Sequence, residues 1–229
     1  MKKIILLSLS WLVLKTGLAQ TPEALLQNVK AKLDKVNDYE AIGKMKTNVI
    51  FIKVPVASVK IYYRKPNRMK INNESGISFI PKGSVNINTN NIFTLASDYD
   101  LLDAGWEKGT GLRIIKLLPR SENADVVLSI LYVDEKNYLI KKARTTTRES
   151  GTYELEMTYG KYSAYGLADK VIFTFNTKEY KLPKGVTFDY DDGSVKKEDK
   201  NKLNNKKGKI EILYTSYQIN KGLPDSIFD

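Results

Sequence analysis

Alternation of apolar and polar residues, with a period of two, constrains the fold of this chain more than any other feature. It is clearest in segment 153–159, where every odd residue is apolar or aromatic and every even residue is polar. A strand with this pattern buries one face and exposes the other to water. Similar segments, separated by turn-forming residues, predict further strands at 43–54, 57–64, 68–72, 77–80, 91–97, 112–118, 126–133, 138–147, 170–176 and 209–219. The Leu-rich segment 112–118 fits a short helix equally well.

One amphipathic helix is predicted ahead of these strands. Thr21 supplies a hydroxyl for the N-cap, and Pro22 suits the first helical position. Apolar residues then recur at spacings of four, four and three, at Leu25, Val29, Leu33 and Val36. We therefore expect a helix over about 22–36 and an α+β fold, mainly β, in which ten or eleven antiparallel strands form a curled sheet with a covered concave face.

Residues 1–20 have the three parts of a secretory signal peptide. Lys2 and Lys3 precede an apolar segment, 4–14, and the small residues Gly17 and Ala19 follow. The apolar segment is roughly 11 residues long, whereas a membrane-spanning helix needs about 20, which disfavours a membrane anchor or a buried first helix. We expect cleavage near residue 20 and a single exported domain over 21–229. The absence of cysteine excludes both a lipidated cysteine and disulfides.

The chain also contains no histidine, which removes the commonest general base and the commonest metal ligand. No catalytic residue, metal site or cofactor is predicted. The acidic segment 189–193 does not fit a calcium-binding loop, because Lys200 stands at the twelfth position, so a turn is expected there. Three of the 37 basic residues lie in 1–20, which leaves 34 against 26 acidic residues and a net charge of +8. Export argues against nucleic acid as the partner.

Segment 195–209 holds seven lysines and predicts a long flexible loop between two strands. Two interpretations remain open. The loop is either a solvated hairpin tip, or a surface that docks by charge to an anionic membrane or an acidic partner.

The inward face of the predicted sheet carries bulky apolar side chains. Its candidates are Val59, Ile61, Tyr63, Met69, Ile71, Phe79, Leu155, Met157, Tyr159, Phe173 and Phe175. If helices fill the concave face, these residues form an ordinary core. If a helix covers that face as a lid, the same residues line a cavity for an apolar ligand. Alternation alone favours the ordinary core, because nearly every buried face of a sheet is simply core.

Four segments resemble the LolA-like outer-membrane lipoprotein carrier family: 62–71, with its Lys-Pro turn, 133–142, 152–159 and 181–186. The resemblance extends over nearly all of 21–229. It implies an incomplete antiparallel β-barrel whose concavity is capped by helices. It also implies a periplasmic protein that shields lipoprotein acyl chains, accepting them from an inner-membrane release complex and passing them to an outer-membrane acceptor.

The same resemblance implies roles for particular residues. The family carrier uses an Arg immediately before the proline for transfer, a position that Lys65 occupies here, with Arg64 preceding it. Lysine keeps the charge but lacks the planar guanidinium. Met69 and Ile71 fall where the family has bulky cavity residues. The resulting hypothesis is a monomeric, non-enzymatic carrier of lipoprotein acyl chains or free lipid, with Arg64 and Lys65 at the rim. The alternatives are a lipid sensor that uses the same pocket and an envelope protein with a packed core.

Overall fold

A computed structural model describes residues 20–49, 52–53, 56–66, 68–75, 98–149, 151–176 and 207–228. They form one α-helix, eleven strands and two short 3-10 helices. The elements are α1 (Pro22–Leu33), β1 (Asp38–Val49), β2 (Ile52–Lys53), β3 (Ala57–Arg64), β4 (Arg68–Ser75), β5 (Tyr99–Trp106), β6 (Arg113–Pro119), β7 (Val126–Asp134), β8 (Leu139–Thr147), β9 (Gly151–Thr158), η3 (Ser163–Tyr165), β10 (Lys170–Asn176), β11 (Lys207–Ile219) and η5 (Asp225–Ile227).

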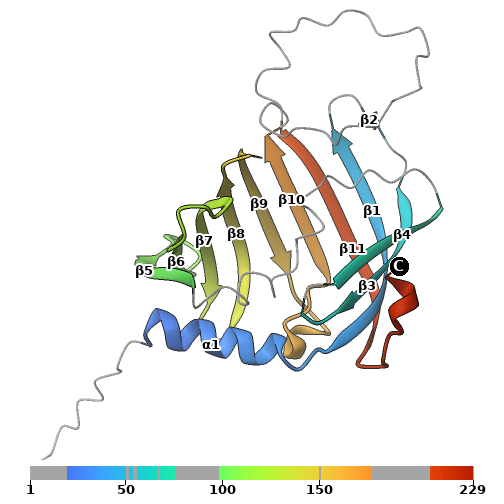
Figure 1. Cartoon of the computed structure of the whole chain (residues 1–229), viewed down its shortest axis with the longest axis horizontal. Coiled ribbons are helices and arrows are strands. Elements are labelled where there is room, and N and C mark those ends of the chain that lie inside the picture. The colour runs from blue at the N-terminus through green and yellow to red at the C-terminus, as the bar shows by residue number, and fades with distance from the viewer. Residues whose placement is uncertain are drawn as a thin grey trace, which may run out of the picture.

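The strands form one antiparallel sheet in the order β4-β3-β1-β11-β10-β9-β8-β7-β6-β5, and β2 pairs with β1 (Figure 1). From β5 to β10 each strand pairs with its neighbour in the chain, whereas β11 inserts between β1 and β10. The sheet is curved and open, with β4 and β5 at its two ends. This architecture confirms the expected mainly-β fold, an incomplete barrel with few helices.

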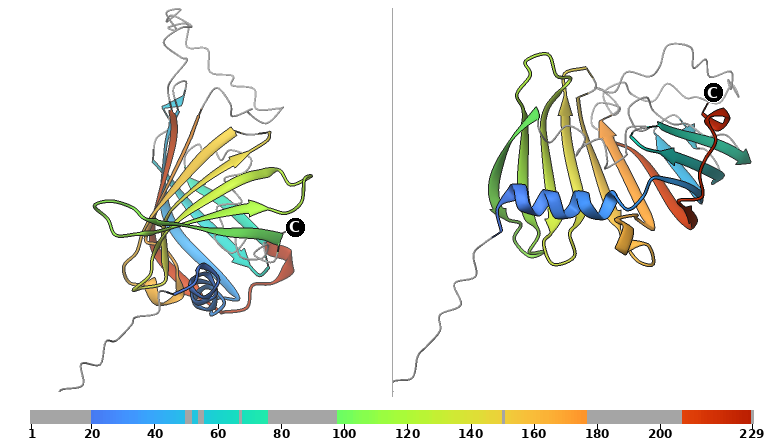
Figure 2. Two further views of the ribbon diagram at one scale, coloured as in Figure 1. Left: turned by 90° about the vertical axis from the view of Figure 1, so that its left-hand side faces the viewer. Right: turned by 60° about the horizontal axis from the view of Figure 1, so that its bottom comes forward.

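Helix α1 lies across the strands on one face of the sheet, near one end of β5–β10 (Figures 1 and 2). The Thr21 hydroxyl accepts a hydrogen bond from the Ala24 amide at 3.2 Å, as an N-cap does. The buried residues of the helix are Leu25, Leu26, Val29 and Leu33. These side chains join the inward residues of the strands in one hydrophobic core.

The helix ends at Leu33, three residues before the predicted end at Val36. The chain turns there because Asn220, just after β11, binds the connection to β1. The Asn220 side-chain amide donates to the Lys35 carbonyl at 2.7 Å, and its oxygen accepts from the Asn37 amide at 2.7 Å. Because Asn220 is so far away in the chain, the end of the helix could not be predicted from the local helical pattern.

The predicted strands within the described residues are present with shifted ends, except that segment 43–54 is divided between β1 and the short β2, which pairs antiparallel with β1. Segment 112–118 is a strand, so the helical alternative is wrong for it. Strand β1 begins at Asp38, ahead of the predicted 43, and β5 was not predicted. Predicted strands 77–80 and 91–97, the acidic turn 189–193, the proposed signal up to residue 19 and most of the lysine-rich loop lie outside the described residues. The last residues of that loop, from Lys207, already belong to β11.

A bulge in β11 determines which of its side chains face inward. Ile42 pairs with Ser216 and Gly43 with Tyr214, so Thr215 is an extra residue in the ladder. Alternation therefore shifts by one position, and Tyr214 and Tyr217 face the same side although they are three residues apart. A Cβ at Gly43 would lie 2.9 Å from the Leu213 carbonyl oxygen, so this close approach needs glycine.

None of the helices in the described part of the chain has the length and hydrophobicity to cross a bilayer. In the same residues, no group of three or more acidic side chains is arranged to hold a metal ion.

Candidate functional site

A cavity of about 60 Å³ lies where the C-terminal end of α1 meets the β4-β3-β1-β11 end of the sheet. All of its described lining residues are uncharged. They are Leu33, Val36, Tyr39, Ile61, Tyr63, Met69, Ile71, Met157, Tyr159, Gly166, Leu167, Ala168, Val171, Ile212, Tyr214 and Tyr217. The walls therefore come from α1, the edge strand β4, its neighbour β3, the strands β1, β11, β10 and β9, and the segment around η3.

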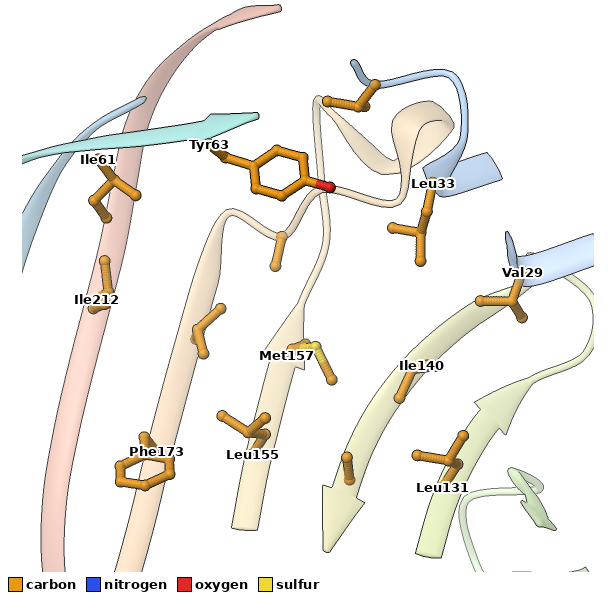
Figure 3. Close-up of a cluster of buried hydrophobic side chains, with 14 of the residues drawn as sticks. Val29, Leu33, Ile61, Tyr63, Leu131, Ile140, Leu155, Met157, Phe173 and Ile212 are labelled. Atoms are coloured by element: carbon orange, nitrogen blue, oxygen red, sulfur yellow. The ribbon is translucent and has the colours of Figure 1, made fainter. Parts of the chain in front are cut away.

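Six of the eleven residues predicted from alternation and resemblance line this cavity. They are Ile61, Tyr63, Met69, Ile71, Met157 and Tyr159. Figure 3 shows Ile61 and Tyr63 on β3, Met157 on β9 and Leu33 on α1 turned toward the same interior space. Met69 and Ile71 are only partly buried, because β4 is the edge strand and pairs with β3 alone.

The other predicted residues lie elsewhere. Val59, Leu155, Phe173 and Phe175 are buried on the inward face, farther along the strands, and belong to the core without lining the cavity. Phe79 lies outside the described residues. Whether any of these residues contacts a ligand stays a prediction.

Three tyrosines that the sequence did not suggest also line the cavity: Tyr39, Tyr214 and Tyr217. Tyr39 was missed because β1 begins earlier than predicted. Tyr217 was missed because the bulge at Thr215 breaks the alternation of β11, whereas Tyr214 continues the alternation of the buried Ile210 and Ile212 and could have been found from it. Their rings pack together, since the ring centroid of Tyr217 lies 5.3 Å from that of Tyr39 and 5.1 Å from that of Tyr214.

The hydroxyls of the lining tyrosines differ in their partners. Tyr159 donates to the Ile140 carbonyl and Tyr217 to the Ala168 carbonyl, both at 2.7 Å, and Tyr63 donates to the Pro66 carbonyl at 3.3 Å. Among the described residues, no hydrogen bond from the hydroxyl of Tyr39 or Tyr214 is formed. Burial raises the pKa of both phenols above the usual value, so both stay protonated and able to donate at neutral pH.

A smaller void, of about 10 Å³, lies beneath α1. Val29 and Leu33 of the helix line it together with Ile140, Tyr159 and Gly166. Leu33, Tyr159 and Gly166 also line the larger cavity, so these three residues separate the two spaces. Displacement of α1 would join them.

The predicted rim residues sit at the β3–β4 turn and contact two other parts of the chain. The Lys65 ammonium group donates to the Asp34 carbonyl at 2.6 Å and lies 3.5 Å from the Asp34 carboxylate, at the C-cap of α1. Arg64 donates to the Leu223 carbonyl at 2.9 Å and pairs with Asp225. Lys65 therefore holds the end of the helix, and Arg64 holds the C-terminal segment.

Comparisons with known proteins show a fold. Three solved structures are similar over most of this chain and of their own length. A putative outer membrane lipoprotein-sorting protein domain from Vibrio parahaemolyticus has a TM-score of 0.51 and 10% identity, covering 90% of this chain and 94% of its own. A LolA superfamily protein from Nitrosomonas europaea has a TM-score of 0.52 and 10% identity, covering 89% and 97%.

The chain has the LolA-like fold. A DUF1329 family protein from Desulfovibrio piger is similar to the same extent, with a TM-score of 0.54, 14% identity, and coverage of 90% of this chain and 94% of its own. No family model and no curated protein matches the sequence. At identities this low the likeness of the LolA-like structures concerns the path of the backbone, and the residues of the cavity have to be argued from this chain alone.

Proposed function

We propose that this protein is a periplasmic carrier that shields acyl chains of lipoproteins, or of lipids, inside its curved sheet. The observation that carries the proposal is the uncharged cavity between α1 and the open end of a LolA-like sheet. Burying hydrocarbon in such a space contributes about 0.8 kcal/mol per methylene. No covalent step is required, and release needs only an acceptor that offers the chain an equally apolar environment.

The resting cavity is too small for a whole acyl chain. A volume of about 60 Å³ admits roughly four to six groups the size of a water molecule or a methylene. Loading a long chain therefore requires the cavity to widen. Helix α1 is the element best placed to move, because the smaller void beneath it would then merge with the larger one.

The β3–β4 turn supports this assignment, because it connects the cavity wall to the helix. Tyr63 on β3 and Met69 on β4, the strands on either side of the turn, line the cavity. The ammonium group of Lys65, in the turn, holds the last turn of α1 through Asp34. An exposed ion pair of this kind is worth about 0–1 kcal/mol. It is weak enough to open when a ligand enters, which suits a lid.

The test replaces one cavity residue by a charged one. Ile71 lines the cavity from edge strand β4 and is partly buried, so Ile71→Glu places a carboxylate at the wall where water remains within reach. We expect the variant to fold, and to lose at least tenfold in affinity for a fluorescent fatty acid ester, because an acyl chain would desolvate that charge.

The matched control is Leu102→Glu, which introduces the same charge at an exposed apolar position on β5, at the other end of the sheet. This variant should bind the ester as the parent does. Equal binding by Ile71→Glu and the parent would remove the cavity as the binding site. No binding by the parent would overturn the carrier function itself and leave the concave face as a core.

A further inference from the structure

Two hydroxyls in the cavity are the feature that its hydrophobic character leaves unexplained. The Tyr39 side chain lines the cavity with only 7% of the residue exposed, and Tyr214 lines the same space from the neighbouring strand. Both rings pack against the ring of Tyr217, with centroid separations of 5.3 Å for Tyr39 and 5.1 Å for Tyr214. Neither hydroxyl donates a hydrogen bond within the described residues, unlike those of Tyr63, Tyr159 and Tyr217.

An unpaired buried hydroxyl costs free energy, about 1–3 kcal/mol by mutational measures. Phenylalanine at position 39 would fill the same space without that cost, and Tyr214 is partly buried. The three neighbouring tyrosines show that this region can satisfy a phenol with a backbone carbonyl where the hydroxyl has a structural role. Two donors left facing one uncharged cavity are therefore suited to an acceptor that arrives with a ligand.

The charge of the cavity lining determines which kind of ligand acceptor could bind the hydroxyls of Tyr39 and Tyr214. Every described lining residue is uncharged, and burial keeps both phenols protonated. A carboxylate placed here would have no cation to compensate its desolvation. A neutral oxygen acceptor needs only the two donors that are present, and in lipids the neutral acceptor next to an acyl chain is the carbonyl of an ester or amide.

We propose that Tyr39 and Tyr214 donate hydrogen bonds to the ester or amide carbonyl of a bound acyl chain, so that the cavity selects acylated molecules over free fatty acids. This inference rests on the proposed function and specifies its ligand. The donors lie on β1 and β11, the third and fourth strands from the β4 edge, while Met69 and Ile71 line the same cavity from β4 itself. The hydrocarbon would contact the apolar lining and the carbonyl would face the tyrosine pair.

The experiment measures displacement of the neutral dye N-phenyl-1-naphthylamine from the purified protein at pH 8. Competitors of matched length are methyl decanoate, ionised decanoate and undecane, in the same fraction of ethanol. We expect methyl decanoate to compete best. Tyr39→Phe and Tyr214→Phe should each lower the affinity for methyl decanoate roughly three- to tenfold. Neither substitution should change the affinity for undecane. Tyr165→Phe, the same change outside the cavity lining, should alter neither.

The outcomes separate this inference from the proposed function. If the esters and undecane bind but the Phe variants weaken both equally or neither, the tyrosine anchor is wrong while the carrier function stands. If ionised decanoate binds as well as its methyl ester, selection for a neutral carbonyl is wrong. If nothing displaces the dye, or the dye does not bind, the proposed function fails. The affinities of a diacylglyceryl-cysteine peptide and a diacyl phospholipid for the same variants show whether the tyrosine pair binds the esters of lipoproteins or those of phospholipids.

A stability measurement checks the premise. Because the Tyr39 hydroxyl has no hydrogen-bond partner among the described residues, Tyr39→Phe should leave the thermal unfolding midpoint of the lipid-free protein unchanged or raise it. Tyr217→Phe removes the 2.7 Å bond to the Ala168 carbonyl and should lower the midpoint. A clear loss in Tyr39→Phe would show that its hydroxyl is structural and would overturn the proposal.

Discussion

Polar side chains on the inward face of the sheet are held by specific partners, and Arg113 is the clearest case. Its guanidinium, on β6, is buried between two carboxylates: Nε donates to Asp103 at 2.9 Å and a terminal nitrogen to Glu135 at 3.0 Å. The same group lies 4.3 Å from the ring centroid of Trp106, whose indole donates to Glu135 at 3.3 Å. This cluster fixes strand β5 to β6 at the end of the sheet far from the cavity.

The Arg113 cluster makes stability depend on pH. Hydrogen bonds from Arg113 hold the pKa of Asp103 below its ordinary value of about 3.8. A carboxylate with a lowered folded-state pKa stabilises the fold above its unfolded pKa and loses that contribution as pH falls through the folded value. We expect Asp103→Asn to be less stable than the parent at pH 7, with the difference shrinking below about pH 4.

Urea unfolding at a series of pH values measures this directly. Asp100→Asn, which changes an exposed acid on the same strand, is the control and should change little at any pH. A constant difference between Asp103→Asn and the parent across the acid range would contradict the role of the ionised carboxylate.

Alternation predicts the side chains that continue a regular strand and misses those that depend on irregularity. Ile61, Tyr63 and Met157 were placed correctly on the inward face because β3 and β9 alternate without interruption at these positions. Tyr217 depends on the extra residue Thr215, which nothing in the local sequence marks, whereas Tyr214 is in phase with Ile210 and Ile212. The apolar part of the cavity could therefore be predicted, whereas Tyr217, and Tyr39 ahead of the predicted start of β1, could not.

At the scale of elements, α1 is held against the sheet by close contact with the segment after η3. Gly166 has a φ of +67°, and a Cβ built on it would lie 2.8 Å from the nearest Leu33 methyl group. Glycine is thus required twice, for the left-handed backbone and for the approach of the helix. The same two residues line both voids, so this contact also sets the width of the cavity.

Replacing Gly166 by alanine should loosen the helix. The left-handed backbone costs about 1–2 kcal/mol for a residue with a side chain, and the clash with Leu33 adds about 1 kcal/mol or more. Gly109→Ala is the matched control, because its φ is +86° and no atom lies within 4 Å of an added Cβ. Thermal or urea unfolding should show a larger loss for Gly166→Ala, and equal losses would contradict the packing role of this glycine.

Element boundaries could be predicted only where local pattern decides them. The start of α1 follows from Thr21 and Pro22, whereas its end depends on Asn220, almost 190 residues away. Strand β5 escaped prediction because Asp103 faces inward to meet Arg113, which breaks the apolar alternation. A charged residue can be assigned to an inward face only when the partner that compensates its charge is known.

At the scale of the whole molecule, the sequence predicts a curled, open antiparallel sheet but not its strand order. Neighbouring strands from β5 to β10 are joined in chain order, as short turns require. The insertion of β11 between β1 and β10 is a non-local pairing that local sequence does not encode. This pairing brings Tyr39 beside Tyr217 and so completes the cavity, which is why the site is a property of the fold rather than of any one segment.

In the proposed function, this molecule holds acyl chains within its curved sheet. The most direct measurement is native mass spectrometry of the protein purified from bacterial cells, before and after extraction with organic solvent. We expect a discrete mass of acyl lipid or acylated protein that extraction removes and that added acyl ester restores. A bare mass throughout, with no uptake of added ester, would contradict the account and show that the concave face is only a hydrophobic core.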